Sequence, residues 1–220
     1  MISQLFGPRR RRPVGTYVAL GDSFTAGNGC DPRERWADLV ADGLRAENPG
    51  LEYFNLARDG ADSHDVLAQV PAAVSARADL VTLVCGANDV ILNLRPDIAA
   101  FTGRFELMLD RLRRTLPGVA ILTATYPEGW RLEGIGPRTQ SRIQGGMREL
   151  NGAIREVSAA RIVPCLETVD HPGIADPANF EPDGLHPSPA GHVHAATEFR
   201  RALAGNFSIQ TTNRRQRQWR

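Results

Sequence analysis

Ser23, Asn88 and His186 lie far apart in the chain, but together they are side chains that acyl transfer requires. A serine hydroxyl is barely nucleophilic at neutral pH and needs a neighbouring base such as an imidazole. The tetrahedral intermediate carries a negatively charged oxygen, which preorganised hydrogen-bond donors stabilise. These residue types therefore predict a site for acyl transfer, provided that the fold brings them together.

Ser23 is the predicted nucleophile, in the tripeptide Gly21-Asp22-Ser23 directly after an apolar run at 16–20. At a strand-to-helix turn, backbone N–H groups give a partial positive field that favours a reacting serine. The alternative is that Asp22 and Ser23 only cap the following helix, a common role for both residue types.

His186 is the predicted general base, and Asp183 is expected to orient its other ring nitrogen and to stabilise the imidazolium. The short Asp-x-x-His spacing allows one turn to supply both side chains. The alternative is a loop histidine beside a turn, because Pro182-Asp183-Gly184 is a good turn sequence.

The predicted oxyanion hole consists of the backbone N–H groups of Ser23 and Gly60 and the side-chain amide of Asn88. A glycine lets the backbone approach a substrate closely, and the amide donates from the side. Alternatively, Gly60 and Asn88 occupy ordinary turns after strands.

Candidate substrate contacts are His64, Tyr126 and Trp130. His64 follows Gly60 closely, and the other two belong to the segment 126–146, expected to be the longest irregular stretch. Long ordered loops are often binding loops or lids, and the alternative is an ordinary solvated loop. Apolar side chains after Asn88 either line an acyl pocket or pack in the core, which is their more common use: Ile91, Leu92 and Leu94.

The remaining histidines predict no further site. His192 and His194 are two residues apart in the last predicted helix, so they point in different directions and suit neither a metal pair nor a shared site. His171 precedes a proline and is expected to be exposed.

Strand-like apolar runs alternate with helical patterns along the chain. Strands are expected at 16–20, 51–56, 80–85, 119–125 and 161–166, and helices at 34–48, from 62 onward, at 97–116, at 138–160 and from 189 onward. Pro71 should kink or shorten the second helix, and Ser188 should cap the last, in which Val193 is expected to face inward. This alternation predicts a parallel, five-stranded, three-layer α/β/α domain. Ligands bind such sheets beyond the carboxyl ends of the strands, where the candidate residues follow.

Composition excludes several classes of function. The 220 residues, 42% hydrophobic and 23% charged, fit one soluble globular domain, and the formal net charge of +1 gives no global field for nucleic acid. No run of about 18 apolar residues is present to span a membrane. The three cysteines lack a metal-like spacing, and Cys85 and Cys165 are interpreted as small buried hydrophobes. We expect a cytoplasmic protein without a metal, with a secreted mature fragment as the alternative; the oligomeric state is not readable from the sequence.

Four stretches resemble conserved blocks of the GDSL or SGNH hydrolase family, in the family's order. Residues 17–27 resemble its first block, 55–61 its second, 86–89 its third and 183–187 its fifth. By this resemblance the family's functional residues are Ser23, Gly60, Asn88 and His186, with Asp183 as the third triad member. The resemblance implies a flavodoxin-like, doubly wound sandwich and hydrolysis of a small-molecule ester through an acyl-enzyme, without metal or cofactor.

Residues 14–204 are expected to form a single SGNH hydrolase domain, between basic ends at 1–13 and 205–220 that are expected to be flexible. One alternative is an acyltransferase with the same acyl-enzyme and an acceptor other than water. A second is a flavodoxin-like binding module, because hydroxyls and glycines near a helix start suit a phosphate. That module leaves Asn88, Asp183 and His186 unexplained. Nucleic-acid binding by the terminal arginines is the least favoured.

Overall fold

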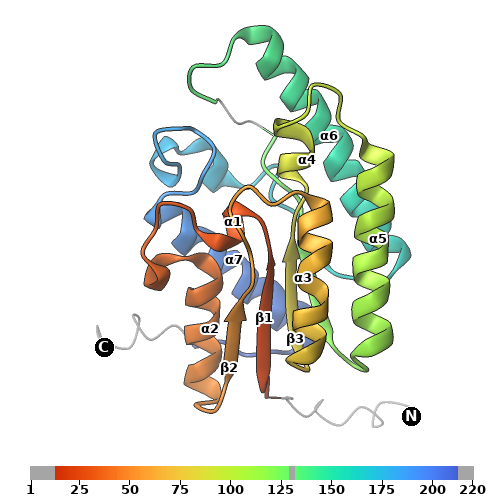
Figure 1. The fold of residues 1–220 in the computed structure, drawn as a ribbon. Helices are drawn as coiled ribbons and strands as arrows, with labels where there is room; N and C mark the ends of the chain where they lie inside the picture. The colour runs from red at the N-terminus through yellow and green to blue at the C-terminus, as the bar shows by residue number, and fades with distance from the viewer. Residues whose placement is uncertain (1–12, 129–131, 213–220) are drawn as a thin grey trace, which may run out of the picture.

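A five-stranded parallel sheet forms the centre of the molecule (Figure 1). The computed structural model describes residues 13–128 and 132–212. The strands run in the order β2-β1-β3-β4-β5, which is the flavodoxin-like order. Their bounds are Thr16–Gly21 for β1, Glu52–Asn55 for β2, Leu80–Val84 for β3, Ala120–Ala124 for β4 and Cys165–Leu166 for β5.

The two central strands fix where the polar motifs emerge. Every residue of β1 and of β3 is buried, as expected for continuous apolar runs covered on both faces. Their parallel register places the last residues, Gly21 and Val84, opposite each other. The segments that follow, with Ser23 and Asn88, therefore leave the same edge of the sheet from neighbouring strands.

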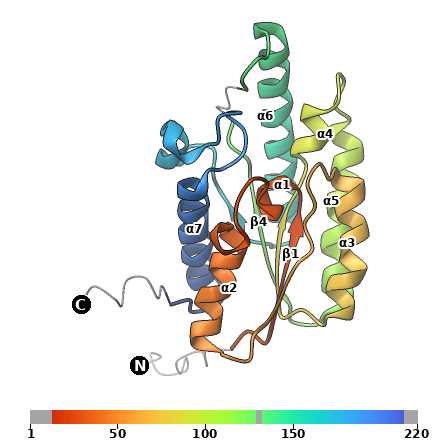
Figure 2. The ribbon, with the colours of Figure 1, turned by 60° about the vertical axis from the view of Figure 1, so that its left-hand side comes forward.

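Helices cover both faces of the sheet and complete the three-layer sandwich (Figure 2). On one side α2 packs against α7, and on the other α3 packs against α5, which contacts α6. The helices are α1 (Ser23–Ala26), α2 (Trp36–Glu47), α3 (Ser63–Ser75), α4 (Ala87–Ile91), α5 (Ile98–Thr115), α6 (Pro137–Ala160) and α7 (Pro189–Phe207), with short 3-10 turns η1 (Pro32–Glu34), η2 (Pro172–Ala175) and η3 (Pro177–Asn179). None of these helices in the described part of the chain combines the length and apolarity needed to cross a bilayer.

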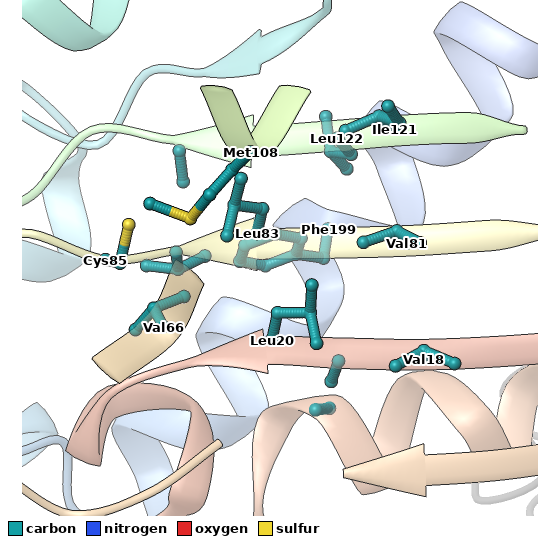
Figure 3. Close-up of a cluster of buried hydrophobic side chains, with 14 of the residues drawn as sticks. Val18, Leu20, Val66, Val81, Leu83, Cys85, Met108, Ile121, Leu122 and Phe199 are labelled. Carbon is teal, nitrogen blue, oxygen red and sulfur yellow. The ribbon is translucent and has the colours of Figure 1, made fainter. Parts of the chain in front are cut away.

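The core consists of aliphatic side chains from the strands, with larger side chains from the helices packed onto them. Leu20, Leu83 and Leu122 come from three adjacent strands, and Met108 of α5 and Phe199 of α7 pack near them (Figure 3). Burying a side chain of this size stabilises the fold by about 1.5–3 kcal/mol. The edge of the sheet is therefore held by a rigid, closely packed scaffold.

The predicted layers and strands are confirmed, but several local predictions were wrong. The segment 126–146 is not irregular throughout, because α6 begins at Pro137, where the missing N–H of proline costs nothing. Gly146 lies inside α6 against Val90, and a Cβ there would approach the valine to 2.7 Å, so close packing explains the glycine. The short helix α4 was not predicted, and β5 spans only Cys165–Leu166.

Three further differences concern helix interiors and ends. Helix α3 is not shortened at Pro71 but continues to Ser75. Ser188 caps α7 and accepts the N–H of Gly191 as expected, but Val193 is 45% exposed and does not face inward. Helix α7 continues to Phe207, and Ile209 beyond it is buried, so the packed structure extends past the predicted boundary at residue 204.

Candidate active site

Ser23 is the first residue of α1, directly beyond the carboxyl end of β1. The preceding turn requires glycine, because a Cβ at Gly21 would collide with the carbonyl oxygen of Val84. Gln69 holds this turn from α3, since its side-chain amide both accepts the N–H of Gly21 and donates to its carbonyl, each over 2.9 Å. The position of the serine is thus set by contacts on both sides.

The capping role that the sequence allowed for Asp22 and Ser23 belongs to Asp22. Its Oδ1 accepts the N–H of Phe24 at 3.0 Å, and its Oδ2 accepts the hydroxyl of Tyr126 at 2.5 Å. The carboxyl is fully buried, and this burial raises its pKa to about 7 in spite of the two hydrogen bonds. A titratable group therefore lies directly beside the serine.

Tyr126 is itself held firmly at the end of β4. Asn151 of α6, which is fully buried, accepts the N–H of Tyr126 and donates to its carbonyl, each over 2.8 Å. The tyrosine ring also contacts Phe24 edge-on, with ring centroids 5.3 Å apart. A chain of hydrogen bonds thus connects α6, through Asp22, to the turn that carries Ser23.

His186 bridges Ser23 and Asp183, although 163 positions separate the serine from the histidine. Its Nε2 lies 2.9 Å from the Oγ of Ser23, and its Nδ1 lies 2.6 Å from an oxygen of Asp183. A carboxylate at Nδ1 favours the tautomer that protonates this nitrogen and leaves Nε2 as an acceptor facing the serine. The three side chains form one continuous relay from hydroxyl to carboxylate.

Asp183 also forms the turn that the sequence allowed as its alternative role. Its second oxygen accepts the N–H groups of Leu185 at 2.8 Å and His186 at 3.0 Å. Burial raises the pKa of this carboxyl, but the bonds from the imidazole and the two amides outweigh burial and leave the pKa below its ordinary value. The carboxyl is therefore ionised near neutral pH.

Asn88 and Gly60 lie in adjacent segments on the same edge of the sheet. The Nδ2 of Asn88, in the first turn of α4, donates to the carbonyl of Ala61 at 2.9 Å. A carboxamide nitrogen carries two N–H groups, and this bond uses one of them. Gly60 is exposed, and its φ of 72° lies in the left-handed region that favours glycine.

The predicted substrate contacts lie in different environments. His64 is exposed on the first turn of α3, where its ring and two carboxylates, of Asp62 and Asp65, come within 4.8 Å of one another. Tyr126 is only 1% exposed and its hydroxyl is bonded to Asp22, but the residue lines an apolar cavity, so its contact with substrate stays a prediction. Trp130 lies outside the described residues.

Of the apolar side chains after Asn88, only Ile91 packs against the core. Leu92 is 67% exposed and Leu94 is 84% exposed, while Ile91 is half-buried. An apolar cavity of about 110 Å³ lies elsewhere, between the ends of β4 and β5 and the first turns of α7. Phe24 and Pro187 are among its lining residues, and each is the chain neighbour of one relay residue. Ser23 and His186 are not in its wall.

The other histidines and the cysteines do not join the relay. His192 is fully buried and its Nδ1 accepts the N–H of Trp36 at 3.3 Å; burial lowers the pKa of its imidazole to about 4. His171 is half-buried, 3.5 Å from Glu198, so the prediction that it is exposed was wrong. All three cysteines are free thiols, and burial raises the pKa of the Cys85 thiol well above its ordinary value.

Two groups of residues at the site were missed by sequence reasoning. The sequence offered Asp22 only an alternative role as a helix cap, and its bond to Tyr126 was not anticipated. A buried network of Ser63, Asp89 and Arg104 was not anticipated, although Asp89 directly follows Asn88 in the chain. The available signal was a charged residue in a short motif between apolar segments, which is costly to bury without a partner.

Comparisons with known proteins concern the family and the fold of the chain. The model of the GDSL-like Lipase/Acylhydrolase family matches residues 19–194. No curated protein matches the chain. Among solved structures, the crystal structure of TesA is 21% identical, covers 86% of this chain and 98% of its own, and has a TM-score of 0.70. The lipase/acylhydrolase from Enterococcus faecalis is 23% identical, covers 90% of this chain and 98% of its own, and has a TM-score of 0.70. The psychrotrophic esterase EstA from Pseudoalteromonas sp. is 16% identical, covers 87% of this chain and 97% of its own, and has a TM-score of 0.68. At these identities the likeness concerns the fold.

Proposed function

Because the chain belongs to the GDSL-like lipase/acylhydrolase family and is an ester hydrolase, we propose that it cleaves a carboxylic ester through an acyl-enzyme on Ser23. The observation that supports this mechanism is the continuous relay of Ser23, His186 and Asp183, with heavy-atom distances of 2.9 and 2.6 Å. Both distances lie in the range over which a positioned base removes a proton.

In the first half of the reaction, the Oγ of Ser23 attacks the ester carbonyl carbon while its proton moves to Nε2 of His186. Asp183 stabilises the imidazolium by accepting a hydrogen bond from its Nδ1–H, and the proton stays on the imidazole. The imidazolium then donates its Nε2 proton to the departing alcohol as the carbon–oxygen bond breaks. The acyl group is left as an ester on Ser23.

In the second half, water takes the place of the alcohol. His186 removes a proton from the water, which attacks the acyl carbonyl, and the proton returns to Ser23 as the carboxylic acid leaves. Both tetrahedral intermediates carry a negative oxygen. We place this oxygen against the backbone N–H groups of Ser23 and Gly60 and the side-chain amide of Asn88, which follow three adjacent strands on one edge.

The mechanism is tested by Ser23→Ala on a short-chain aryl ester. We expect kcat to fall by at least about 10³-fold, because the variant has no nucleophile to form the acyl-enzyme. Ser75→Ala is the matched control, since Ser75 is exposed at the far end of α3, and it should keep wild-type turnover. Undiminished turnover of folded Ser23→Ala protein would rule out the proposed mechanism.

A further inference from the structure

Two segments from different parts of the chain must lie at a fixed separation if the proposed oxyanion hole is to work. Gly60 precedes α3, whereas Asn88 lies in α4, after the next strand. We propose that Asp89, held by Ser63 and Arg104, is a positioning residue that sets this separation. The inference rests on the proposed function, because it assigns Asp89 a role only through the donors at Gly60 and Asn88.

Asp89 connects the two segments by hydrogen bonds to a single residue. Its Oδ2 accepts the backbone N–H of Ser63 at 2.8 Å, and its Oδ1 accepts the hydroxyl of Ser63 at 2.5 Å. Next to this pair, Asn88 donates to the carbonyl of Ala61 at 2.9 Å. Residues 61–63 are therefore tied to residues 88–89 at two adjacent points, directly after Gly60.

Arg104 of α5 closes the network from a third element. Its Nε donates to the hydroxyl oxygen of Ser63 at 2.7 Å, and its Nη2 lies 3.2 Å from the Oδ1 of Asp89. The hydroxyl of Ser63 thus accepts from the guanidinium and donates to the carboxylate. Ser63 and Arg104 sit on α3 and α5, which pack against each other.

Burial and charge explain why this network needs all its members. The Asp89 side chain is only 6% exposed and that of Arg104 is 31% exposed. An uncompensated carboxylate here would be costly to bury, and its charge would oppose the negative charge that develops on the substrate oxygen close by. The guanidinium offsets both effects. Asp89 can therefore act as a rigid tie without weakening the donors that it positions.

The first test is Asp89→Asn, measured on a short-chain aryl ester. The substitution keeps the side-chain shape but removes one acceptor and the charge. We expect kcat to fall about 30-fold with KM changed less than about threefold, because misplaced donors weaken binding of the transition state more than of the substrate. Asp110→Asn is the matched control. Asp110 lies near the other end of α5 from Arg104 and also pairs with an arginine, Arg161 at 2.9 Å, and kcat should be unchanged.

A double-mutant cycle separates positioning from a general loss of structure. In an Asn88→Ala background, one of the donors that Asp89 places is already gone, so Asp89→Asn should lower kcat by less than about threefold. Any loss of kcat that remains in this background measures how far Asp89 positions the other donor, the N–H of Gly60. If Asp89→Asn lowers kcat by the same factor in both backgrounds, or leaves the wild-type kcat unchanged, the positioning role is wrong.

Arg104 provides a second route in case Asp89→Asn does not fold. Arg104→Met should lower kcat about tenfold, and Arg104→Lys, which keeps the charge, should recover at least a third of wild-type kcat. Equal losses in both variants, or wild-type kcat in Arg104→Met, would overturn the proposal. Failure of the proposed function would appear as activity in Ser23→Ala. If only this inference is wrong, Ser23→Ala stays inactive.

Discussion

Asp22 combines deep burial with the position next to the proposed nucleophile. Its carboxyl accepts one backbone N–H and the hydroxyl of Tyr126, but burial dominates and raises its pKa from 3.8 to about 7. In the unfolded chain the same carboxyl titrates near its ordinary value. Between about pH 4 and 7 the native state therefore binds more protons at this site than the unfolded state does, and stability falls as pH rises through that window.

Asp22→Asn should remove this dependence. Relative to wild type, the free energy of unfolding of the variant should rise between pH 4 and pH 7.5 by on the order of 2–4 kcal/mol, because the amide carries no charge to bury. Urea unfolding at several pH values measures the difference, and other titrating groups cancel between the two proteins. Asp170→Asn, at an exposed position, is the control, and its free energy of unfolding should change with pH as that of the wild type does. A parallel curve for Asp22→Asn would contradict the prediction.

The hydroxyl of Tyr126 is the side-chain donor that restrains Asp22. Tyr126→Phe keeps the ring packed on Phe24 but leaves the buried carboxyl without this bond, which should cost about 1–3 kcal/mol in stability. Because Asp22 caps the helix that begins with Ser23, we also expect kcat for a short-chain ester to fall several-fold. Tyr53→Phe removes a similar bond, from Tyr53 to Asp38 at 3.2 Å, and should leave kcat unchanged. Equal kcat in the two variants would show that the hydroxyl of Tyr126 does not help to position Ser23.

At the residue scale, the sequence could predict groups that belong to short motifs but not their distant partners. The sequence placed Ser23, Asp183 and His186 together, and the structure joins them by hydrogen bonds, because acyl transfer restricts which residue types were considered. The bond between Asp22 and Tyr126 spans 104 positions, and no local pattern encodes such a pairing. The sequence predicts Tyr126 in a surface loop, and only the structure shows that it is buried and bonded to Asp22.

Among the elements, the segment between β5 and α7 determines where the imidazole lies. Ser188 caps α7 two residues after His186, accepting the N–H of Gly191 at 3.2 Å and donating to the carbonyl of Ala178 at 2.6 Å. The helix start is thereby joined to η3. Gly191 lets the two approach closely, because a Cβ there would collide with the carbonyl oxygen of Asn179.

Gly191→Ala should therefore destabilise the protein by at least about 1 kcal/mol and lower kcat, because α7 or η3 must shift and the His186 loop lies between them. Gly205→Ala in the same helix is the matched control. It meets no atom within 4 Å, and alanine is the better helix former, so it should stabilise by about 0.5–1 kcal/mol with unchanged kcat. Thermal unfolding and steady-state kinetics measure both variants. A neutral Gly191→Ala would show that the close approach is not required.

Element prediction succeeded where a pattern is long and failed where it is short. The buried strands and the helices α2, α5 and α6 have enough periodic residues to show their type. Helix α4 has only five residues and follows Gly86, whose φ is 122°, so its sequence is that of a turn. Strand β5 pairs over two residues only, because the apolar run before it includes Ile162, which is 84% exposed. Packing, not propensity, decided these boundaries.

At the scale of the whole molecule, strand order explains why the proposed site is on this edge. The chain passes from β1 to β2 through α2 on one face and from β2 to β3 through α3 on the other, and open α/β sheets bind ligands at such a switch point. Ser23 follows β1, Gly60 follows β2 and Asn88 follows β3, so three adjacent strands deliver the proposed nucleophile and oxyanion donors. His186 arrives from the far side of the sheet through the α7 loop. The topology thus explains how segments from distant parts of the chain meet at the proposed site.

The proposed acyl-enzyme is also testable without mutation. If the alcohol leaves before the acceptor attacks, the intermediate carries no trace of the leaving group. Esters that share one acyl group but differ in their alcohol should then give the same ratio of free acid to transferred product when a fixed concentration of a small alcohol acceptor is added. Chromatographic product analysis over three or more leaving groups measures this ratio. Ratios that change with the leaving group would mean that water and acceptor attack the ester directly, without an intermediate on Ser23. A constant ratio also fixes how strongly the site prefers water, which decides between hydrolysis and acyl transfer as its main reaction.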